Sequence, residues 1–142
     1  MISIITPVLN GSLYIESTIR SIQKLTIDYE HIIVDGGSTD STLDIISKYP
    51  KVKIISQLEK LGMYHAIDLG ISLAKGKYIS WVNSDDKIIP SGFESMYNEI
   101  YKNNYDFVYS NGIHHFVDEF RYKIVCSLPF TKYFLQQGIF PF

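Results

Sequence analysis

Residues 78–86 read YISWVNSDD, a short apolar run that leads directly into four polar residues. The apolar run from Tyr78 to Val82 has the length and the aromatic and β-branched content of a buried strand. The polar part ends on two neighbouring carboxylates, Asp85 and Asp86. Ligands of open α/β sheets bind at the carboxyl ends of the strands, so in such a fold these two carboxylates would lie at the ligand edge.

Strands and helices alternate through the rest of this region. Apolar runs of the strand type cover residues 2–9, 30–34, 52–56 and 78–82. Apolar residues at helical spacing, or a turn rich in capping side chains, predict helices over residues 12–25, about 40–48 and 64–74, and after Pro90. The alternation predicts an α/β, Rossmann-like fold with a mostly parallel sheet flanked by helices.

The pattern of strands and helices becomes weaker after Asn111. A short strand is predicted before this point, at residues 107–109, and a small C-terminal hairpin is predicted from residues 113–117 and 122–126 around Asp118 and Glu119. A short helix is predicted at residues 129–138.

The parallel arrangement predicts where a ligand would bind. The loops after the strands, residues 6–12, 35–40, 56–63 and 83–87, should gather at one edge of the sheet. They are also the polar, glycine-rich and acidic parts of the chain. The candidate site is therefore expected at this edge.

Composition excludes several classes of protein. The 142 residues are 46% hydrophobic and 20% charged, which is ordinary for a globular protein, and the formal net charge is −2. No basic block is present, so we expect no nucleic-acid partner. Cys126 is the only cysteine, no apolar run approaches the ~20 residues of a membrane span, and the N-terminus lacks the features of a signal peptide. A cytoplasmic location is expected.

The acidic residues at the strand ends have a functional and a structural interpretation. Asp35 could accept hydrogen bonds from a base or a ribose, or it could close a turn before the next helix. Asp85 and Asp86 repel each other unless something compensates, and Mg²⁺ or Mn²⁺ with oxygen ligands does so. Capping of the following helix is the alternative for this pair.

Other motifs with known chemistry are missing. The sequence has no Gly-x-Gly-x-x-Gly after the first strand, no phosphate-binding loop ending in Gly-Lys-Ser/Thr, and no Gly-x-Ser-x-Gly elbow. His31, within a predicted strand, is expected to serve packing, and His65 to lie near the edge.

Three segments together resemble family 2 glycosyltransferases, which have the GT-A fold. They are IITPVLN at residues 4–10, IVDGGSTD at residues 33–40 and AKGKYISWVNSDD at residues 74–86. They follow the order and the spacing of the family, and the resemblance extends from Met1 to about Gly112. It implies that residues 1–142 form a single GT-A-like nucleotide-sugar-binding domain, truncated on its C-terminal, acceptor side.

The resemblance also implies roles for individual residues. Nucleotide-binding roles are implied for Thr6, Pro7, Val8, Asp35, Asn83 and Ser84, with Asp35 holding the base. Asp85 is implied as the main metal ligand and Asp86 as its assistant, in a motif that has Asn83 in place of the family's first Asp. Contacts with the donor sugar and the diphosphate are implied for Glu59, Gly62, Met63 and Tyr64, with Ala66 in the same segment. The chain departs from the family at His65, where Asp is more frequent, and at Asp68, where Asn is.

These roles predict an inverting, metal-dependent transfer of a sugar from a nucleotide-sugar donor, expected to be a UDP-sugar, to a glycan or lipid-linked acceptor. The general base is expected outside this chain. Two alternatives stay open: a catalytically incomplete nucleotide-binding module, and a nucleotidyltransferase. Peripheral association with the inner face of the membrane and the oligomeric state are also left open.

Overall fold

The computed structural model describes residues 1–57, 61–116 and 121–125. The chain divides into two compact units, Met1–Glu94 and Ser95–Phe142, and each is described by itself. Among the described residues, no helix combines the length and the apolar character needed to cross a bilayer. A single domain over residues 1–142 stays a prediction.

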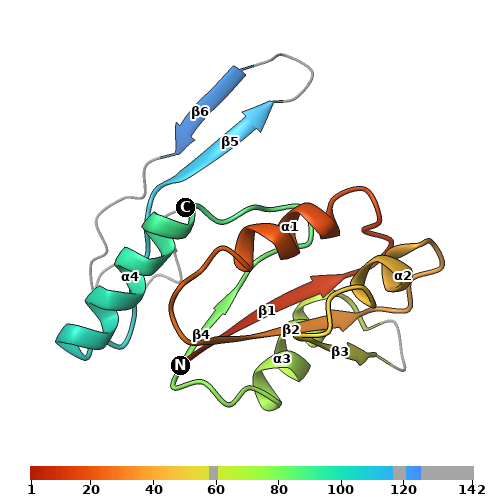
Figure 1. Cartoon of the computed structure of the whole chain (residues 1–142), viewed down its shortest axis with the longest axis horizontal. Helices are drawn as coiled ribbons and strands as arrows, with labels where there is room; N and C mark the ends of the chain where they lie inside the picture. Colours follow the sequence, from red (N-terminus) through yellow and green to blue (C-terminus); the bar gives the residue numbers. More distant parts are fainter. Residues whose placement is uncertain (58–60, 117–120, 126–142) are drawn as a thin grey trace. The chain divides into compact units, whose positions relative to one another are not determined.

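The first unit is built on a four-stranded sheet (Figure 1). Its strands are β1 (Ile2–Val8), β2 (Tyr29–Asp35), β3 (Val52–Ser56) and β4 (Tyr78–Trp81). The order is β3-β2-β1-β4, and every pairing is parallel. Val8 pairs with Asp35 and Asp35 with Ser56, so the carboxyl ends of three strands are level. The prediction of a mostly parallel sheet is confirmed.

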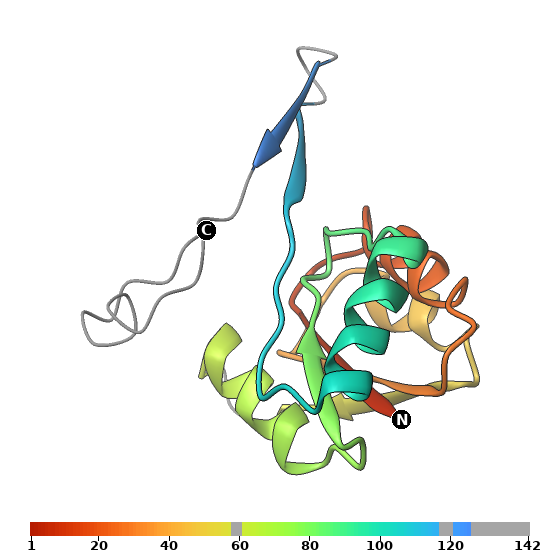
Figure 2. The same ribbon diagram turned by 90° about the vertical axis from the view of Figure 1, so that its left-hand side faces the viewer.

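Helices cover both faces of this sheet (Figure 2). They are α1 (Ile15–Ile22), α2 (Thr42–Ile46) and α3 (Met63–Ser72), and α4 (Pro90–Asn103) follows β4. One buried cluster joins α1 and α2 to the sheet and contains Val8, Ile15, Ile19, Ile33 and Ile46. A second cluster joins Ile32 and Val34 to Ala66 of α3. Neighbouring residues of β2 therefore face opposite helix layers, as the alternation of a strand requires.

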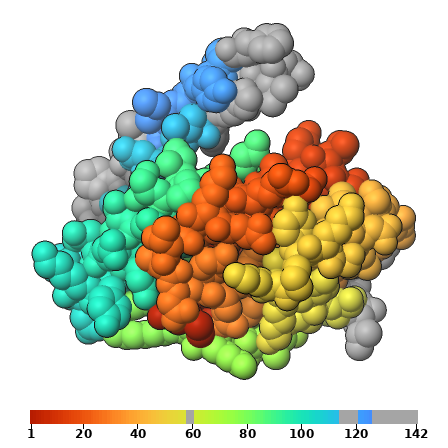
Figure 3. Space-filling view, viewed as in Figure 1, coloured from red at the N-terminus to blue at the C-terminus, as the bar shows by residue number. Residues whose placement is uncertain are grey.

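In a space-filling view from the same side as Figure 1, the red strand β1 is largely hidden behind residues coloured orange to yellow (Figure 3). Burial on both faces explains why the inner strands β1 and β2 read as nearly continuous apolar runs. The edge strands β3 and β4 are only partly covered, so the buried strand expected at residues 78–82 is wrong in its burial. All seven residues of β1 are buried.

The second unit contains the end of α4, an extended segment and a two-stranded hairpin. The hairpin pairs β5 (Gly112–Phe116) with β6 (Arg121–Val125) in antiparallel fashion, with Ile113 opposite Ile124. The predicted hairpin is confirmed, one residue earlier than expected. The predicted helix at residues 129–138 lies outside the described residues, as do Asp118 and Glu119.

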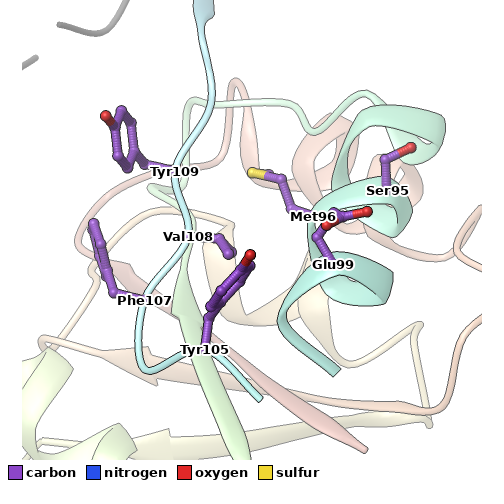
Figure 4. A pocket seen from close by; sticks show the side chains of 7 residues that line it. All are labelled: Ser95, Met96, Glu99, Tyr105, Phe107, Val108 and Tyr109. Carbon is purple, nitrogen blue, oxygen red and sulfur yellow. The ribbon is translucent and has the colours of Figure 1, made fainter. Parts of the chain in front are cut away.

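The predicted strand at residues 107–109 is wrong. The segment belongs to neither sheet, and a short apolar run becomes a strand only when a neighbouring strand supplies its hydrogen bonds. The rings of Phe107 and Tyr109 stack instead, with their centroids 5.9 Å apart. A cavity of about 480 Å³ lies between this segment and α4 (Figure 4), lined by Ser95, Met96, Glu99, Tyr105, Phe107, Val108 and Tyr109.

Candidate functional site

A cavity of about 380 Å³ lies at the carboxyl edge of the parallel sheet. Its volume falls within the range of about 300–1,000 Å³ that small-molecule sites occupy. All four loops predicted to meet at this edge contribute to it, together with the start of α3. The lining residues are Pro7, Val8, Leu9, Gly36, Gln57, Gly62, Met63, Ala66, Asn83, Ser84 and Asp85.

Seven of the candidate residues come together in this cavity. They are Pro7, Val8, Gly62, Met63, Asn83, Ser84 and Asp85. They derive from β1, from the start of α3 and from the loop after β4, segments far apart in the sequence. The wall combines apolar side chains with a carboxylate, two amides and a hydroxyl, which is the usual composition of a ligand site.

Four other candidates are not among the lining residues. Thr6 is fully buried, and its hydroxyl lies 2.9 Å from Nε2 of His31. The side chain of Asp35 is also buried and accepts hydrogen bonds from the backbone N–H groups of Gly37 and Ser38, so it closes a turn. Tyr64 is 79% exposed, and Asp86 is exposed beside Asn83. Glu59 lies outside the described residues.

Asn83, Asp85 and Asp86 form an acidic turn directly after β4. Nδ2 of Asn83 donates to Oδ2 of Asp86 over 3.1 Å, and the backbone N–H of Asp86 donates to the Asn83 carbonyl, also over 3.1 Å. Oδ1 of Asn83 is buried and has no hydrogen-bond partner within the described part of the chain. Capping of α4 does not account for the acidic pair, because that helix begins only at Pro90.

The oxygen atoms of this turn suit a hard divalent cation. Within residues 1–57, 61–116 and 121–125, no three His, Cys, Asp or Glu side chains form a metal-binding group. Mg²⁺ usually takes only one or two carboxylates and completes its shell with water and phosphate oxygens. Two carboxylates beside an unpartnered amide oxygen fit that requirement.

A hydrogen-bond network fixes the loops after β1 and β2 to each other. The backbone N–H groups of Asn10 and Gly11 donate to Ser38 Oγ and Thr42 Oγ1 over 2.8 and 2.9 Å. Asp40 accepts hydrogen bonds from Thr42 and from the Ser12 backbone, and these lower its pKa to about 2. One wall of the cavity is thus held by side chains of the opposite loop before any ligand binds.

Residue patterns alone did not single out Leu9, Gly36 and Gln57 as lining residues. All three nevertheless fall within the loops that the topology placed at the edge. Gln57 gave the clearest signal, since it is a polar residue directly after a predicted strand. Its side chain is 7% exposed, and its Nε2 lies 3.0 Å from Nδ1 of His65.

His31 is buried beside Thr6, and its protonation makes the stability of the protein depend on pH. It is 3% exposed, and burial lowers its pKa from 6.5 to about 4. Between these pH values the unfolded chain binds a proton that the folded chain does not. Stability should therefore fall as the pH falls from 6.5 towards 4, by about 2 kcal/mol between about pH 7.5 and about pH 5.

Urea denaturation of wild type and His31→Gln at the two pH values measures this contribution. Glutamine can still form a hydrogen bond with Thr6, but it does not titrate. We expect the difference in unfolding free energy between the two proteins to change by about 2 kcal/mol between the two conditions. An unchanged difference would contradict the assignment to His31.

Solved structures share this fold. The Staphylococcus aureus TarS fragment 1–349 in complex with UDP-GlcNAc superposes with a TM-score of 0.68 and 26% identity, over 72% of this chain and 32% of that chain. A mannosyltransferase from Pyrobaculum calidifontis, PcManGT, superposes with a TM-score of 0.58 and 22% identity, over 62% and 28% of the two chains. At that identity the second likeness concerns the fold alone. The first unit is thus an α/β domain of the GT-A type.

The sequence comparisons define the family. Residues 3–140 match the sequence model of the family described as "Glycosyl transferase family 2". A curated relative, the glycosyltransferase GlyG of Streptococcus pneumoniae, is 34% identical over 116 residues, which are 78% of this chain and 38% of GlyG. The chain belongs to glycosyl transferase family 2, and it spans less than half the length of this relative.

Proposed function

We propose that this chain is the nucleotide-sugar-binding part of an inverting glycosyltransferase that uses a UDP-sugar and Mg²⁺ or Mn²⁺. The observation that carries the proposal is the cavity of about 380 Å³ in which Pro7, Val8, Ser84 and Asp85 come together at the carboxyl edge of the sheet. The binding of UDP-GlcNAc by TarS, a fold neighbour at 26% identity, supports uridine as the nucleoside.

The acidic turn is assigned to the cation. Asp85 lines the cavity and is the proposed main ligand, and Asp86 assists beside it. A divalent ion bound here would neutralise charge on the leaving nucleoside diphosphate. Asn83 holds Asp86 through its amide N–H, and its unpartnered Oδ1 is free to accept a hydrogen bond from a bound ligand.

The start of α3 is assigned to the diphosphate. Gly62 and Met63 line the cavity, and Gly62, the N-cap residue, has no side chain to cap the helix. Uncapped backbone N–H groups and the helix dipole favour anionic oxygens at a helix N-terminus. Gly62 has a φ of 88°, a left-handed conformation that glycine adopts without strain.

The acceptor is proposed to be a glycan or a lipid-linked glycan, and a lipid-linked one would bring the protein to the inner face of the membrane. Asp85 is the only titratable side chain among the residues that line the described cavity, and it is assigned to the metal. The general base that deprotonates the acceptor hydroxyl is therefore proposed to come from another part of the whole protein.

Calorimetric titration of the chain with UDP tests this function. We expect binding in the presence of Mn²⁺, loss of binding with EDTA, and much weaker binding of UMP, which lacks the β-phosphate. A dissociation constant of ~1 mM corresponds to a binding free energy of about −4 kcal/mol. Failure of the folded protein to bind UDP at that concentration would contradict the assignment of the donor. Binding of UDP without turnover of any UDP-sugar would favour the incomplete nucleotide-binding module.

A further inference from the structure

Helix α1 carries two buried hydroxyl side chains, Thr18 and Ser21, that are hydrogen bonded to the segment after β4. Thr18 Oγ1 lies 2.8 Å from the carbonyl oxygen of Ser84 and 2.7 Å from that of Asp86. Ser21 Oγ accepts from the backbone N–H of Ile88 over 3.2 Å and donates to the Thr18 carbonyl over 2.7 Å. Residues 82–89 lie in no helix or strand, so no backbone ladder fixes them.

The two carbonyl groups that Thr18 contacts lie on either side of the acidic pair Asp85 and Asp86. The carbonyl of Ser84 belongs to the peptide that precedes Asp85, and the carbonyl of Asp86 belongs to the peptide that follows Asp86. A threonine hydroxyl has a single proton, so the two carbonyl oxygens converge on one donor and share it. Thr18 is 0% exposed, and water therefore does not compete for this contact.

We propose that Thr18 is a positioning residue that sets the backbone of Asp85 and Asp86 for binding a divalent cation. The inference rests on the proposed function, because that function assigns these carboxylates to the metal. Mg²⁺ demands near-ideal octahedral geometry, so the direction of each carboxylate matters as much as its presence. Groups that orient metal ligands without touching the metal commonly change its affinity by about 10–100-fold.

Two substitutions separate the hydroxyl from the shape of the side chain. Thr18→Val keeps the volume and removes the donor, whereas Thr18→Ser keeps the donor. Ser17→Ala is the matched control, since Ser17 is on the same helix, is only partly buried, and donates its hydroxyl to the Tyr14 carbonyl. Titration of the 142-residue chain with Mn²⁺ in the presence of UDP, followed by the electron paramagnetic resonance of free Mn²⁺, gives the metal affinity.

We expect Thr18→Val to weaken Mn²⁺ binding about tenfold, and Thr18→Ser and Ser17→Ala to stay within about threefold of wild type. Equal affinities of wild type and Thr18→Val would overturn the inference.

Amide hydrogen exchange without ligand supplies a second readout. Thr18→Val should speed exchange at Asp86 and Ile88 at least about tenfold relative to Thr18→Ser, because local opening becomes easier. If wild type binds no Mn²⁺ with UDP, the proposed function fails and the cation part of the inference is overturned with it. Faster exchange in Thr18→Val would then support only the part in which Thr18 fixes the backbone of Asp85 and Asp86, and unchanged exchange would overturn that part too.

Discussion

Replacement of Asp85 by asparagine is expected to lower the affinity for UDP in the presence of Mn²⁺ by about 100-fold or more. Asp85 is the carboxylate that lines the cavity, and the variant keeps its size while removing the charge. An amide oxygen is a weaker ligand for a hard cation, and the cation in turn holds the diphosphate. Calorimetry with UDP and Mn²⁺ measures the loss.

Asp44→Asn is the matched control for this substitution. Asp44 is exposed on α2 and does not line the cavity, but its replacement changes the net charge by the same amount. We expect wild-type affinity in this control. Equal losses in both variants would mean that general electrostatics, rather than a ligand at Asp85, governs binding. If Asp85→Asn still binds UDP weakly and EDTA no longer changes that binding, the result would further support Asp85 as the metal ligand.

The second large effect is expected at Gly76, where the chain turns from α3 into β4. A Cβ atom at Gly76 would lie 2.5 Å from the backbone nitrogen and 2.7 Å from Oγ of Ser3, and 2.8 Å from the carbonyl carbon of Ile2. Ser3 also accepts a hydrogen bond from the Gly76 N–H over 2.8 Å. Because the obstacle is the backbone of the central strand, it cannot move aside as a flexible side chain would. Gly76→Ala should cost about 3 kcal/mol of unfolding free energy.

Gly92→Ala separates this clash from the general effect of adding a methyl group. A Cβ at Gly92 has no atom within 4 Å, and the residue lies in the first turns of α4. Alanine there should stabilise the protein by about 0.5–1 kcal/mol through helix propensity. Urea denaturation followed by circular dichroism compares the two variants. The same sign for both changes would refute the packing argument at Gly76.

The inner strands β1 and β2 were predictable because they are buried on both faces. Residues 52–56 were predicted with the bounds that β3 has, and the apolar run at residues 2–9 ends one residue after β1. Helix ends were less well predicted. The helix expected from residue 12 begins at Ile15, because Gly11 accepts hydrogen bonds from Tyr14 and Ile15 and a turn precedes the helix.

The site was predicted at the level of loops better than at the level of side chains. Topology placed the loops that hold Leu9, Gly36 and Gln57 at the correct edge, although no role was predicted for any of the three residues. Thr6 shows the limit of a motif. It belongs to the quoted segment of the family, yet the alternation of β1 directs its side chain to His31 in the core. Thr18 contacts Ser84 and Asp86, which follow it in the sequence by 66 and 68 positions. No local sequence pattern encodes contacts over such separations.

The central position of β1 has a consequence for the synthesis of the protein. This strand is synthesised before β2 and β4, yet it lies between them, and its second neighbour is complete only at Trp81. The chain loses conformational entropy when it brings β1 and β4 together, before their pairing stabilises the fold. Parallel sheets of this kind therefore fold slowly. During translation, the seven buried residues of β1 stay open to chaperones and to misassociation until β4 has been made.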